Sequence, residues 1–498
     1  MLRNTAPVAT LARLLAVCCA CLGLTAGAAS ADSGSATLTV DARTQLGTVP
    51  DGAAGVNAMT WNPHLMDAIT PLRLQEAKIR TLAWHLGPAT DLYDWQTNTL
   101  RPDPEPAGRP WGFAIDGPFM TPKYTFDDFA ARAQQADAEM LVHINYGTGT
   151  PEEAAAWVRY ANRDRRYGVK RWEIGEEQWI NGFTGLPFMP DARPDKSPTA
   201  YANDALAFMR AMKAVDPTIE VGIGIAPAAP DGSAYWRWNQ TVISIVRSQV
   251  DFVDYHYYTP TPNDATLLMR PTTAPRTVAR LRGLLDANTA PGDHVDLVIG
   301  EANSNVTATL QTTSIVNALF LADFGATLLE SGVAAFDWYT LHNGTQGGTS
   351  PGASDLGLLS SGECSGSVCQ PPAGTPFPAF YGMRLLNTTL HPSDKMLQTS
   401  SSDPLVAGHV VRKPDGDLVA LLINKSPTTA YETQIQTPGY DVRDLRGIES
   451  YDAVNGLTDA DGFRSCPGQP VTLAPYSLTV VQLSKQDQPG WWHLGCDG

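Results

Sequence analysis

The stretch EMLVHINYGTGTPEEAAAWVRYANRDRRYGVKRWEIGEE, residues 139–177, contains two strand signals around one helix signal. Its two ends, 139–147 and 171–177, are short apolar runs that finish in polar residues. Between them, Thr150 followed by Pro151 is typical of a helix N-cap and first helical position. The stretch therefore predicts a strand–helix–strand unit of the kind that builds parallel sheets.

The same alternation of apolar strand and longer helical pattern runs through most of the chain. It predicts an α/β fold, a (β/α)₈ barrel over residues 52–386. A doubly wound open sheet is the alternative, but VGIGIAP (221–227) lacks the third glycine of a nucleotide-binding loop and leads to proline. The eight predicted strands are 53–59, 78–86, 139–147, 171–177, 220–226, 251–258, 296–303 and 334–341.

The helical pattern ends near residue 386. VAGHVVRKPDGDLVALLINKS (406–426) predicts two strands joined by a Pro-Asp-Gly turn, and VTLAPYSLTVVQLS (471–484) predicts the closing strands. Together with 36–51, residues 387–498 predict an accessory antiparallel β-sandwich domain. We interpret this domain as a structural support, with a separate carbohydrate-binding module as the alternative.

The bulk composition excludes some partners. The 498 residues are 43% apolar and 17% charged, an ordinary globular balance, and the formal net charge is −16. The longest basic cluster is RDRRYGVKR (163–171), which is typical of a helix end. We therefore expect no nucleic acid partner.

Residues 1–31 are predicted to be a secretory signal peptide, with arginines, an apolar run and the small residues Ala29-Ser30-Ala31 before Asp32. A lipoprotein signal using Cys18 is the alternative. We expect a secreted, extracellular protein with no membrane association after signal removal. Of the seven cysteines, four follow the signal, and they predict disulfides Cys364–Cys369 and Cys466–Cys496. A metal site is the rival interpretation, but CSGSVC has no histidine nearby, so neither metal nor cofactor is expected.

Polar residues gather at the predicted strand ends, where the active sites of parallel barrels lie. The fourth strand ends in Glu176 and Glu177, the sixth in His256 and Tyr258, and the seventh carries Glu301. Two carboxylates that flank one bond are what retaining glycoside hydrolysis requires. The sequence contains neither Gly-x-Ser-x-Gly nor His-Glu-x-x-His, so serine and metal hydrolases are set aside.

The chain resembles the retaining (β/α)₈ glycosidases, and within them glycoside hydrolase family 51, the α-L-arabinofuranosidases. The resemblance is carried by GVNAMTWNP, IRTLAWHLGPATDLYDW, INYGTGTPEEAAAWVRYAN, WEIGEEQW, VDYHYY and VIGEANS. It implies that Glu177 is the acid/base and Glu301 the nucleophile, with His256 and Tyr258 orienting the nucleophile. It also places Asn145 near the sugar. Trp61 and Trp338 are candidates for sugar stacking, with packing at the barrel rim as the alternative.

Two positions depart from that family. The family has asparagine immediately before the acid/base, where its amide donates to the sugar 2-hydroxyl, and this chain has Glu176. An ionised carboxylate only accepts hydrogen bonds, and it raises the pKa of a neighbouring carboxyl group. On the second strand TLAWHLGP replaces the family's Arg-x-Pro-Gly-Gly, so Trp84 and His85 are expected to reshape the sugar pocket.

The sequence thus predicts a retaining glycosidase that acts on oligo- or polysaccharide, with arabinofuranosyl as the favoured sugar. Other activities that the same kind of barrel supports are the nearest alternatives, namely β-xylosidase, β-glucuronidase and endo-β-glucanase. A non-catalytic carbohydrate-binding protein is the second class, because Glu176 stands in place of the asparagine.

Overall fold

The computed structural model describes residues 33–105, 114–117, 119–184, 188–459, 464–465 and 468–485. The predicted signal peptide and the predicted Cys466–Cys496 disulfide lie outside these residues. The predicted disulfide Cys364–Cys369 is present and joins two short antiparallel strands, β12 (Cys364–Ser365) and β13 (Val368–Cys369). Among the described helices, none is long and apolar enough to cross a membrane.

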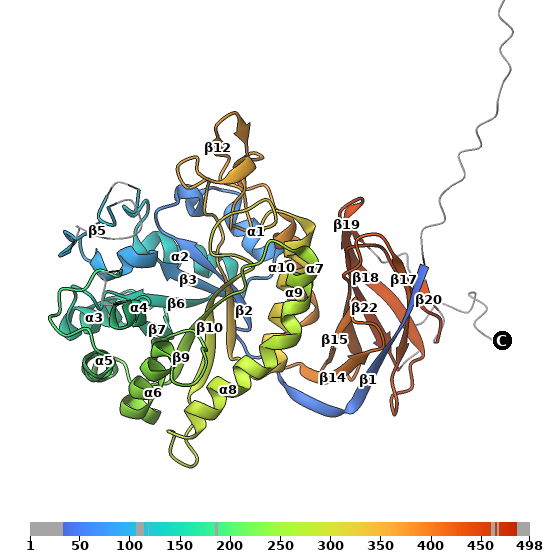
Figure 1. The fold of residues 1–498 in the computed structure, drawn as a ribbon, viewed down its shortest axis with the longest axis horizontal. Coiled ribbons are helices and arrows are strands. Elements are labelled where there is room, and N and C mark those ends of the chain that lie inside the picture. Colours follow the sequence, from blue (N-terminus) through green and yellow to red (C-terminus); the bar gives the residue numbers. More distant parts are fainter. Residues whose placement is uncertain are drawn as a thin grey trace, which may run out of the picture.

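Eight parallel strands close into a barrel, each paired with the next, as the sequence predicts (Figure 1). All eight predicted strands are confirmed. They are β2 (Ala54–Met59), β3 (Thr81–His85), β6 (Glu139–Ile144), β7 (Arg171–Ile174), β8 (Glu220–Ile225), β9 (Phe252–Tyr258), β10 (Asp296–Asn303) and β11 (Ala335–Trp338).

Helices follow the strands around the outside of the barrel. Thr150 caps α3 with proline at the first helical position, as predicted, and Ser197 caps α5 in the same way. The helix predicted to start at Pro151 continues after Val158 as a π-helix, Arg159–Asp164. The described helices are α1 (Thr70–Glu76), α2 (Phe126–Ala136), α3 (Pro151–Val158), α4 (Trp179–Thr184), α5 (Pro198–Val215), α6 (Ala234–Val246), α7 (Asp264–Met269), α8 (Ala274–Asp286), α9 (Ile315–Glu330) and α10 (Pro378–Thr389).

The accessory β-domain lies beside the barrel and includes the N-terminal strand β1 (Ser33–Thr48) (Figure 1). Its pairing is antiparallel throughout except for β1 with β17, which run parallel. The predicted Pro-Asp-Gly turn joins β15 to β16. The other strands are β14 (Lys395–Ser401), β15 (Val406–Arg412), β16 (Leu418–Asn424), β17 (Ala430–Gln436), β18 (Asp444–Asp452), β19 (Gly456–Asp459), β20 (Arg464–Ser465), β21 (Val471–Leu473) and β22 (Ser477–Ser484).

Strand β16 shows how the β-domain is joined to the barrel. Its sequence LVALLIN is apolar on both faces, because successive side chains point to opposite sides of a sheet. Leu418, Ala420 and Leu422 enter the core of the sandwich, whereas Val419, Leu421 and Ile423 belong to the barrel core. Helix α10 packs on β16 and helix α9 packs on the neighbouring strand β15, and nearly all α9 residues are buried, as expected for a helix between two layers.

Candidate functional site

The two glutamates predicted to be catalytic come from different walls of the barrel. Strand β7 ends at Ile174, and Gly175 then takes a φ of 81°, a left-handed conformation that favours glycine. Glu177 itself has a φ of 43°, and such a backbone in a non-glycine residue is strained and typical of functional sites. Glu301 lies within β10, where its register partner on β9 is His256.

His256 joins the two carboxylates. Its Nδ1 lies 2.9 Å from Glu177 Oε1 and 3.4 Å from Glu301 Oε2. Because His256 Nδ1 contacts both groups, Glu177 Oε1 and Glu301 Oε2 can be no farther apart than the sum of these two distances. The separation of roughly 5–5.5 Å that retaining glycosidases use falls within this limit. The Tyr258 hydroxyl also donates to Glu301 Oε2, at 2.5 Å.

His85 bridges a second pair of carboxylates on the other side of Glu301. Its Nε2 lies 2.9 Å from both Glu176 Oε2 and Glu301 Oε1. The side chain of His85 is fully buried, and that of Glu176 is 3% exposed. The structure places the His85 ring against Glu176 and Glu301. That His85 shapes a sugar pocket stays a prediction.

Burial and neighbouring groups shift the pKa values of Glu176 and Glu177 in opposite directions. Burial alone would raise the pKa of Glu176, but His85 and His143 outweigh it and hold that pKa well below its usual value. Burial raises the pKa of Glu177, against the influence of His256, and Glu176 and Glu301 raise it further. Burial also opposes a charge on His256, but Glu301, Asp254 and Glu177 raise its pKa well above the usual value.

Two influences act on the protonation of His85. Burial opposes a positive charge, but Glu176 and Glu301 raise its pKa to about 10, which favours the imidazolium form. The Gly87 N–H, however, donates to His85 Nδ1 at 2.9 Å, and this requires a lone pair on Nδ1. We assign the neutral form on this geometry, so that His85 lowers the pKa of Glu176 through a hydrogen bond from its Nε2–H and not through a positive charge. In both forms Nε2 carries a proton.

A deeper layer of buried titratable groups lies beneath the glutamates. His143 Nδ1 is 3.3 Å from Glu176 Oε2, and His143 Nε2 is 3.8 Å from Glu173 Oε2. Asp254 Oδ2 lies 3.5 Å from His256 Nε2, and burial together with Asp254 raises the pKa of Glu173 well above normal. Neither His143 nor Asp254 was predicted from the sequence. The available signal was a polar residue inside an apolar strand.

Three overlapping groups of these side chains have ligand atoms close enough to hold a metal ion. They are His85, His143 and Glu176; His143, Glu173 and Asp254; and Glu176, His256 and Glu301. A metal-bound histidine usually donates its other ring N–H to an acceptor. His85 instead accepts a hydrogen bond at Nδ1, which leaves the proton on Nε2 and disfavours metal binding there.

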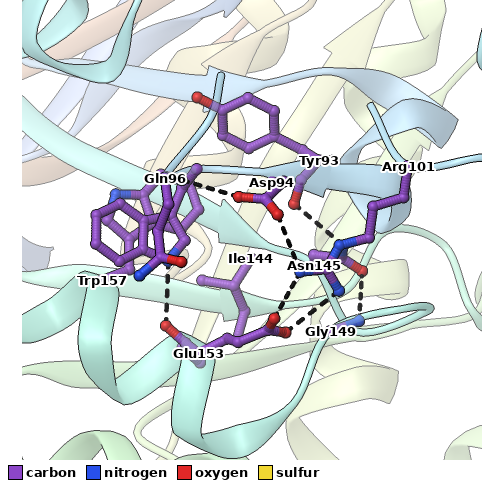
Figure 2. A pocket seen from close by; sticks show the side chains of 11 residues that line it. Tyr93, Asp94, Gln96, Arg101, Ile144, Asn145, Gly149, Glu153 and Trp157 are labelled. Atoms are coloured by element: carbon purple, nitrogen blue, oxygen red, sulfur yellow. Dashed lines mark hydrogen bonds and ion pairs between the residues drawn. The ribbon is translucent and has the colours of Figure 1, made fainter. Parts of the chain in front are cut away.

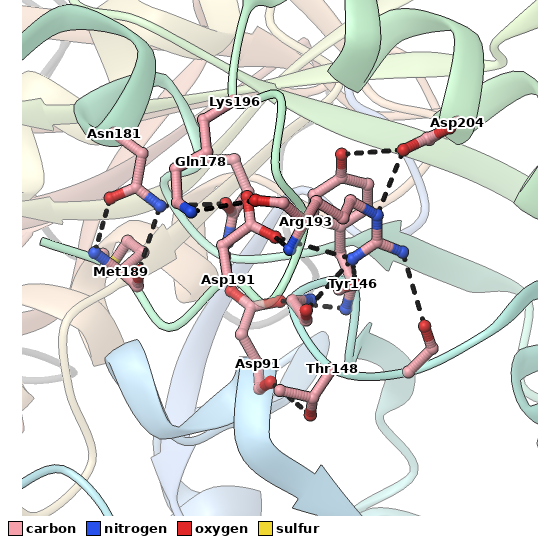
Figure 3. A network of polar contacts seen from close by, with 12 residues as sticks. Asp91, Tyr146, Thr148, Gln178, Asn181, Met189, Asp191, Arg193, Lys196 and Asp204 are labelled. Atoms are coloured by element: carbon pink, nitrogen blue, oxygen red, sulfur yellow. Dashed lines mark hydrogen bonds and ion pairs between the residues drawn. The ribbon is translucent and has the colours of Figure 1, made fainter. Parts of the chain in front are cut away.

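Asp91 holds the loops that carry this site (Figure 3). Its Oδ1 accepts the backbone N–H groups of Tyr146 and Gly147, and its Oδ2 accepts the Glu176 N–H and the Gln178 amide. The segments after β3, β6 and β7 therefore meet at one carboxyl group. Burial raises the pKa of Asp91 to about 8, against the effect of these donors.

The other predicted sugar contacts have different surroundings. The Asn145 amide donates to the Tyr93 carbonyl and the Thr148 hydroxyl, and its carbonyl accepts from Thr148 and Gly149, so its polar groups are used within the loop. Trp338 is buried, with 0% of its surface exposed, and it packs against Phe320 of α9. The packing alternative therefore holds for Trp338.

Trp61 and Trp84 also lie in packed surroundings. Trp61 is 8% exposed and stacks on Phe119 with ring centroids 6.2 Å apart. Trp84 is 0% exposed and belongs to an aromatic cluster with Phe126 and Trp157, so the expectation that it reshapes a sugar pocket is wrong. Tyr339, which was not predicted from the sequence, has its ring centroid 6.3 Å from that of His85 and 6.2 Å from that of Tyr258.

A separate pocket of about 330 Å³ lies by the loops after β3 and β6 (Figure 2). It includes Asn145 and the stacked indoles of Trp95 and Trp157, whose centroids are 5.9 Å apart. Arg101 is ion-paired there with Asp94 and Glu153. The paired glutamates are not part of its lining.

Fold and site together define a closed (β/α)₈ barrel with two glutamates converging from its fourth and seventh strands. No family model matches the sequence. The chain is similar to α-L-arabinofuranosidase C of Emericella nidulans, 27% identical over 238 residues, which cover 43% of this chain and 44% of that protein. It is also similar to an intracellular exo-α-(1→5)-L-arabinofuranosidase of Acetivibrio thermocellus, 25% identical over 150 residues, 26% of this chain and 27% of that one. The chain thus spans less than half of the length of these curated relatives.

Solved structures share the fold over nearly the whole chain. The α-L-arabinofuranosidase of Thermotoga maritima, in an arabinose complex, has a TM-score of 0.66 at 18% identity, covering 90% of this chain and 99% of that one. A xyloglucanase from glycoside hydrolase family 44 of Paenibacillus polymyxa has a TM-score of 0.65 at 13% identity, covering 91% and 100%. The resemblance to family 51 α-L-arabinofuranosidases is therefore confirmed as a similarity of sequence and of fold.

Proposed function

We propose that this protein is a secreted retaining glycoside hydrolase that removes α-L-arabinofuranosyl groups from oligo- or polysaccharide. The observation that carries the proposal is the contact of one nitrogen, His256 Nδ1, with both Glu177 and Glu301. Two carboxyl groups from separate strands then face one small volume, and burial raises the pKa of one of them, Glu177. The similarity to α-L-arabinofuranosidases supports the choice of sugar.

The chemistry follows from the different surroundings of the two glutamates. Glu301, which accepts from Tyr258, attacks the anomeric carbon and forms a covalent glycosyl-enzyme. Glu177, whose pKa is raised by burial, protonates the leaving oxygen. It then removes a proton from the incoming water, which attacks the anomeric carbon and releases Glu301. Two inversions retain the anomeric configuration.

The test uses 4-nitrophenyl α-L-arabinofuranoside and two single variants. Glu301→Ala should abolish turnover, because no nucleophile remains. Glu177→Ala should lower kcat about a hundredfold to ten-thousandfold, the usual contribution of a general acid–base. Azide should restore turnover of Glu177→Ala as an arabinofuranosyl azide, because an anion needs no general base. Glu152→Ala, an exposed glutamate on α3, is the matched control and should keep wild-type activity.

Turnover unchanged in either active-site variant would refute the roles. The second candidate function is a non-catalytic carbohydrate-binding protein, which Glu176 beside the proposed acid/base favours. A third is hydrolysis of another glycoside, which the family 44 xyloglucanase neighbour favours. A panel of aryl α-arabinofuranosides, β-xylosides, β-glucuronides and β-glucosides separates the three, because a binding protein cleaves none of them.

A further inference from the structure

Strand β10 carries a β-bulge immediately before Glu301. Val298 pairs with Asp254 on β9. The next pair is Glu301 with His256, so β10 advances three residues where β9 advances two. The register with β11 shifts at the same place. A bulge of this kind inserts one extra residue into a strand and re-aims the side chains that follow it.

The bulge decides which way the Glu301 side chain points. Val298 packs in one cluster with Phe252 of β9 and with residues of β3, β6 and β11, so it faces the barrel interior. Side chains alternate along a strand, and strict alternation from Val298 would turn Glu301 toward the surrounding helices. A shift of one residue exchanges the two faces. The extra residue therefore lets Glu301 reach His256 and His85 inside the barrel.

Two buried side chains hold the backbone of Gly300, the bulge residue that directly precedes Glu301. The Gly300 N–H donates to Asp254 Oδ1 at 2.5 Å, and the Gly300 carbonyl accepts from the Asn57 amide at 2.9 Å. Asp254 and Asn57 are both 0% exposed. A Cβ atom at position 300 would overlap the Asp254 carboxyl group, so glycine allows this close approach. A bulge disrupts the ladder locally, and the two side chains supply partners for its backbone groups.

Asp254 also contacts the histidine that lies between the two glutamates. Its Oδ2 is 3.5 Å from His256 Nε2, while Nδ1 of the same ring contacts both glutamates. Burial would raise the pKa of Asp254, but His256 and Glu173 outweigh it and hold that pKa below its usual value. The Gly300 N–H therefore donates to an ionised carboxylate, and such hydrogen bonds are roughly twice as strong as neutral ones.

We propose that Asp254 and Asn57 are positioning residues that hold the bulge at Gly300 and so aim Glu301. Asp254 also holds His256 in place between the two glutamates. This inference rests on the proposed function for the role of Glu301 in the reaction. Because both side chains are fully buried, they act on the sugar only through Glu301 and His256. Their loss should therefore slow the chemical step and leave binding of the substrate nearly unchanged.

The first measurement is the kinetics of 4-nitrophenyl α-L-arabinofuranoside hydrolysis. Asp254→Asn keeps the size of the side chain and removes its charge. It should lower kcat about tenfold to a hundredfold, the cost of a small misplacement of a reacting group, and leave KM within about twofold of wild type. Asn57→Ala should likewise lower kcat at nearly constant KM, and it tests the proposal if Asp254→Asn does not fold.

Asp337→Asn is the matched control, because it makes the same change at another buried carboxyl group of the barrel. Asp337 is 0% exposed and lies against Gly55 near the start of β2, away from the strand ends that carry the glutamates. This variant should keep the wild-type kcat and KM. An equal loss of kcat in Asp254→Asn and Asp337→Asn would show a merely structural role and overturn the proposal.

Hydrogen exchange of the Gly300 amide, followed by NMR, tests the same contacts without turnover. Exchange should be about tenfold faster in Asp254→Asn, because a neutral acceptor replaces an ionised one, and unchanged in Asp337→Asn. A folded Asp254→Asn or Asn57→Ala with wild-type kcat, or an unchanged exchange rate in Asp254→Asn, would overturn the proposal. If the exchange rates differ as expected but wild type cleaves no glycoside, the proposed hydrolase function fails and the bulge contacts stand.

Discussion

Three glutamates within the motif WEIGEEQW have three different environments, although only four positions separate the first from the last. Glu173 points into the barrel toward Asp254, and burial raises its pKa well above normal. Glu176 is held ionised between two histidines, whereas burial raises the pKa of Glu177. Residue type alone therefore does not assign acid and base. The positive charges and hydrogen bonds around each carboxyl group do so.

The charge of Glu176 is expected to act on Glu177. Glu176→Asn removes a negative charge that raises the pKa of Glu177, so the pKa of Glu177 should fall. Because the acid must be protonated, activity is lost as pH rises through this pKa. The alkaline limb of the kcat/KM profile should therefore move to lower pH in the variant. An alkaline limb identical to that of wild type would contradict electrostatic coupling between positions 176 and 177.

The meeting of residues from separate strand ends could be predicted where strand position and chemistry agree, as for Glu177, Glu301, His256 and Tyr258. The misassigned residue Trp338 shows what was missing. Its register partner on β10 is Ala302, one residue beyond Glu301, so its side chain points to the helices instead of into the barrel. A four-residue strand such as β11 has too few positions to predict from sequence which side chains face the barrel interior and which face the helices. His143 and Asp254 lie on the longer strands β6 and β9, where a polar residue inside an apolar run was the only local signal.

At the scale of elements, the site depends on loops after three strands that Asp91 ties together. The sequence could predict the strands and the helix caps, because these follow from local patterns of apolar residues and Ser/Thr-Pro pairs. It could not predict that Asp91, 85 residues before Glu176, accepts its backbone N–H. Long-range hydrogen bonds of this kind depend on which loops become neighbours, and that is settled only by closure of the barrel.

Asp91→Asn tests this link between loops. The amide keeps one oxygen for Tyr146 and Gly147, but it turns an N–H₂ toward the Glu176 N–H, which then lacks an acceptor. We expect a loss of about 1–3 kcal/mol in the free energy of unfolding, the cost of an unsatisfied buried donor, and a lower kcat. Thermal unfolding and aryl arabinofuranoside kinetics check both.

The matched control for this change is Asp441→Asn, because the Asp441 side chain is 73% exposed. It should leave the unfolding temperature and kcat at wild-type values. Wild-type stability and kcat in Asp91→Asn would contradict a role of Asp91 in holding the loops.

At the scale of the whole molecule, the barrel and the β-domain share one core and a buried polar contact. Helix α9 packs against β15, and helix α10 packs against β16 and β22, which explains why nearly all α9 residues are buried. Within this layer, His409 of β15 lies 2.9 Å from Asp323 and 3.0 Å from Glu330, both on α9. Lys425 completes the group through Asp323, at 2.5 Å. The β-domain is therefore joined to the barrel by ion pairs as well as by apolar contacts.

His409 gives this junction a dependence on pH whose sign is defined. Burial opposes its charge, but Glu330 and Asp323 raise its pKa to about 10 from 6.5. The folded state therefore binds the proton more tightly, so this stabilisation is complete below pH 6.5 and is lost as pH rises through about 10. His409→Gln should cost about 3–5 kcal/mol at pH 6, because it breaks a buried ion pair, and much less at pH 10. Calorimetric unfolding at the two pH values measures this, with His294→Gln as the exposed control. The variant and the wild type should differ in unfolding temperature more at pH 6 than at pH 10. An equal difference at the two pH values would show that the charge of His409 does not stabilise the junction.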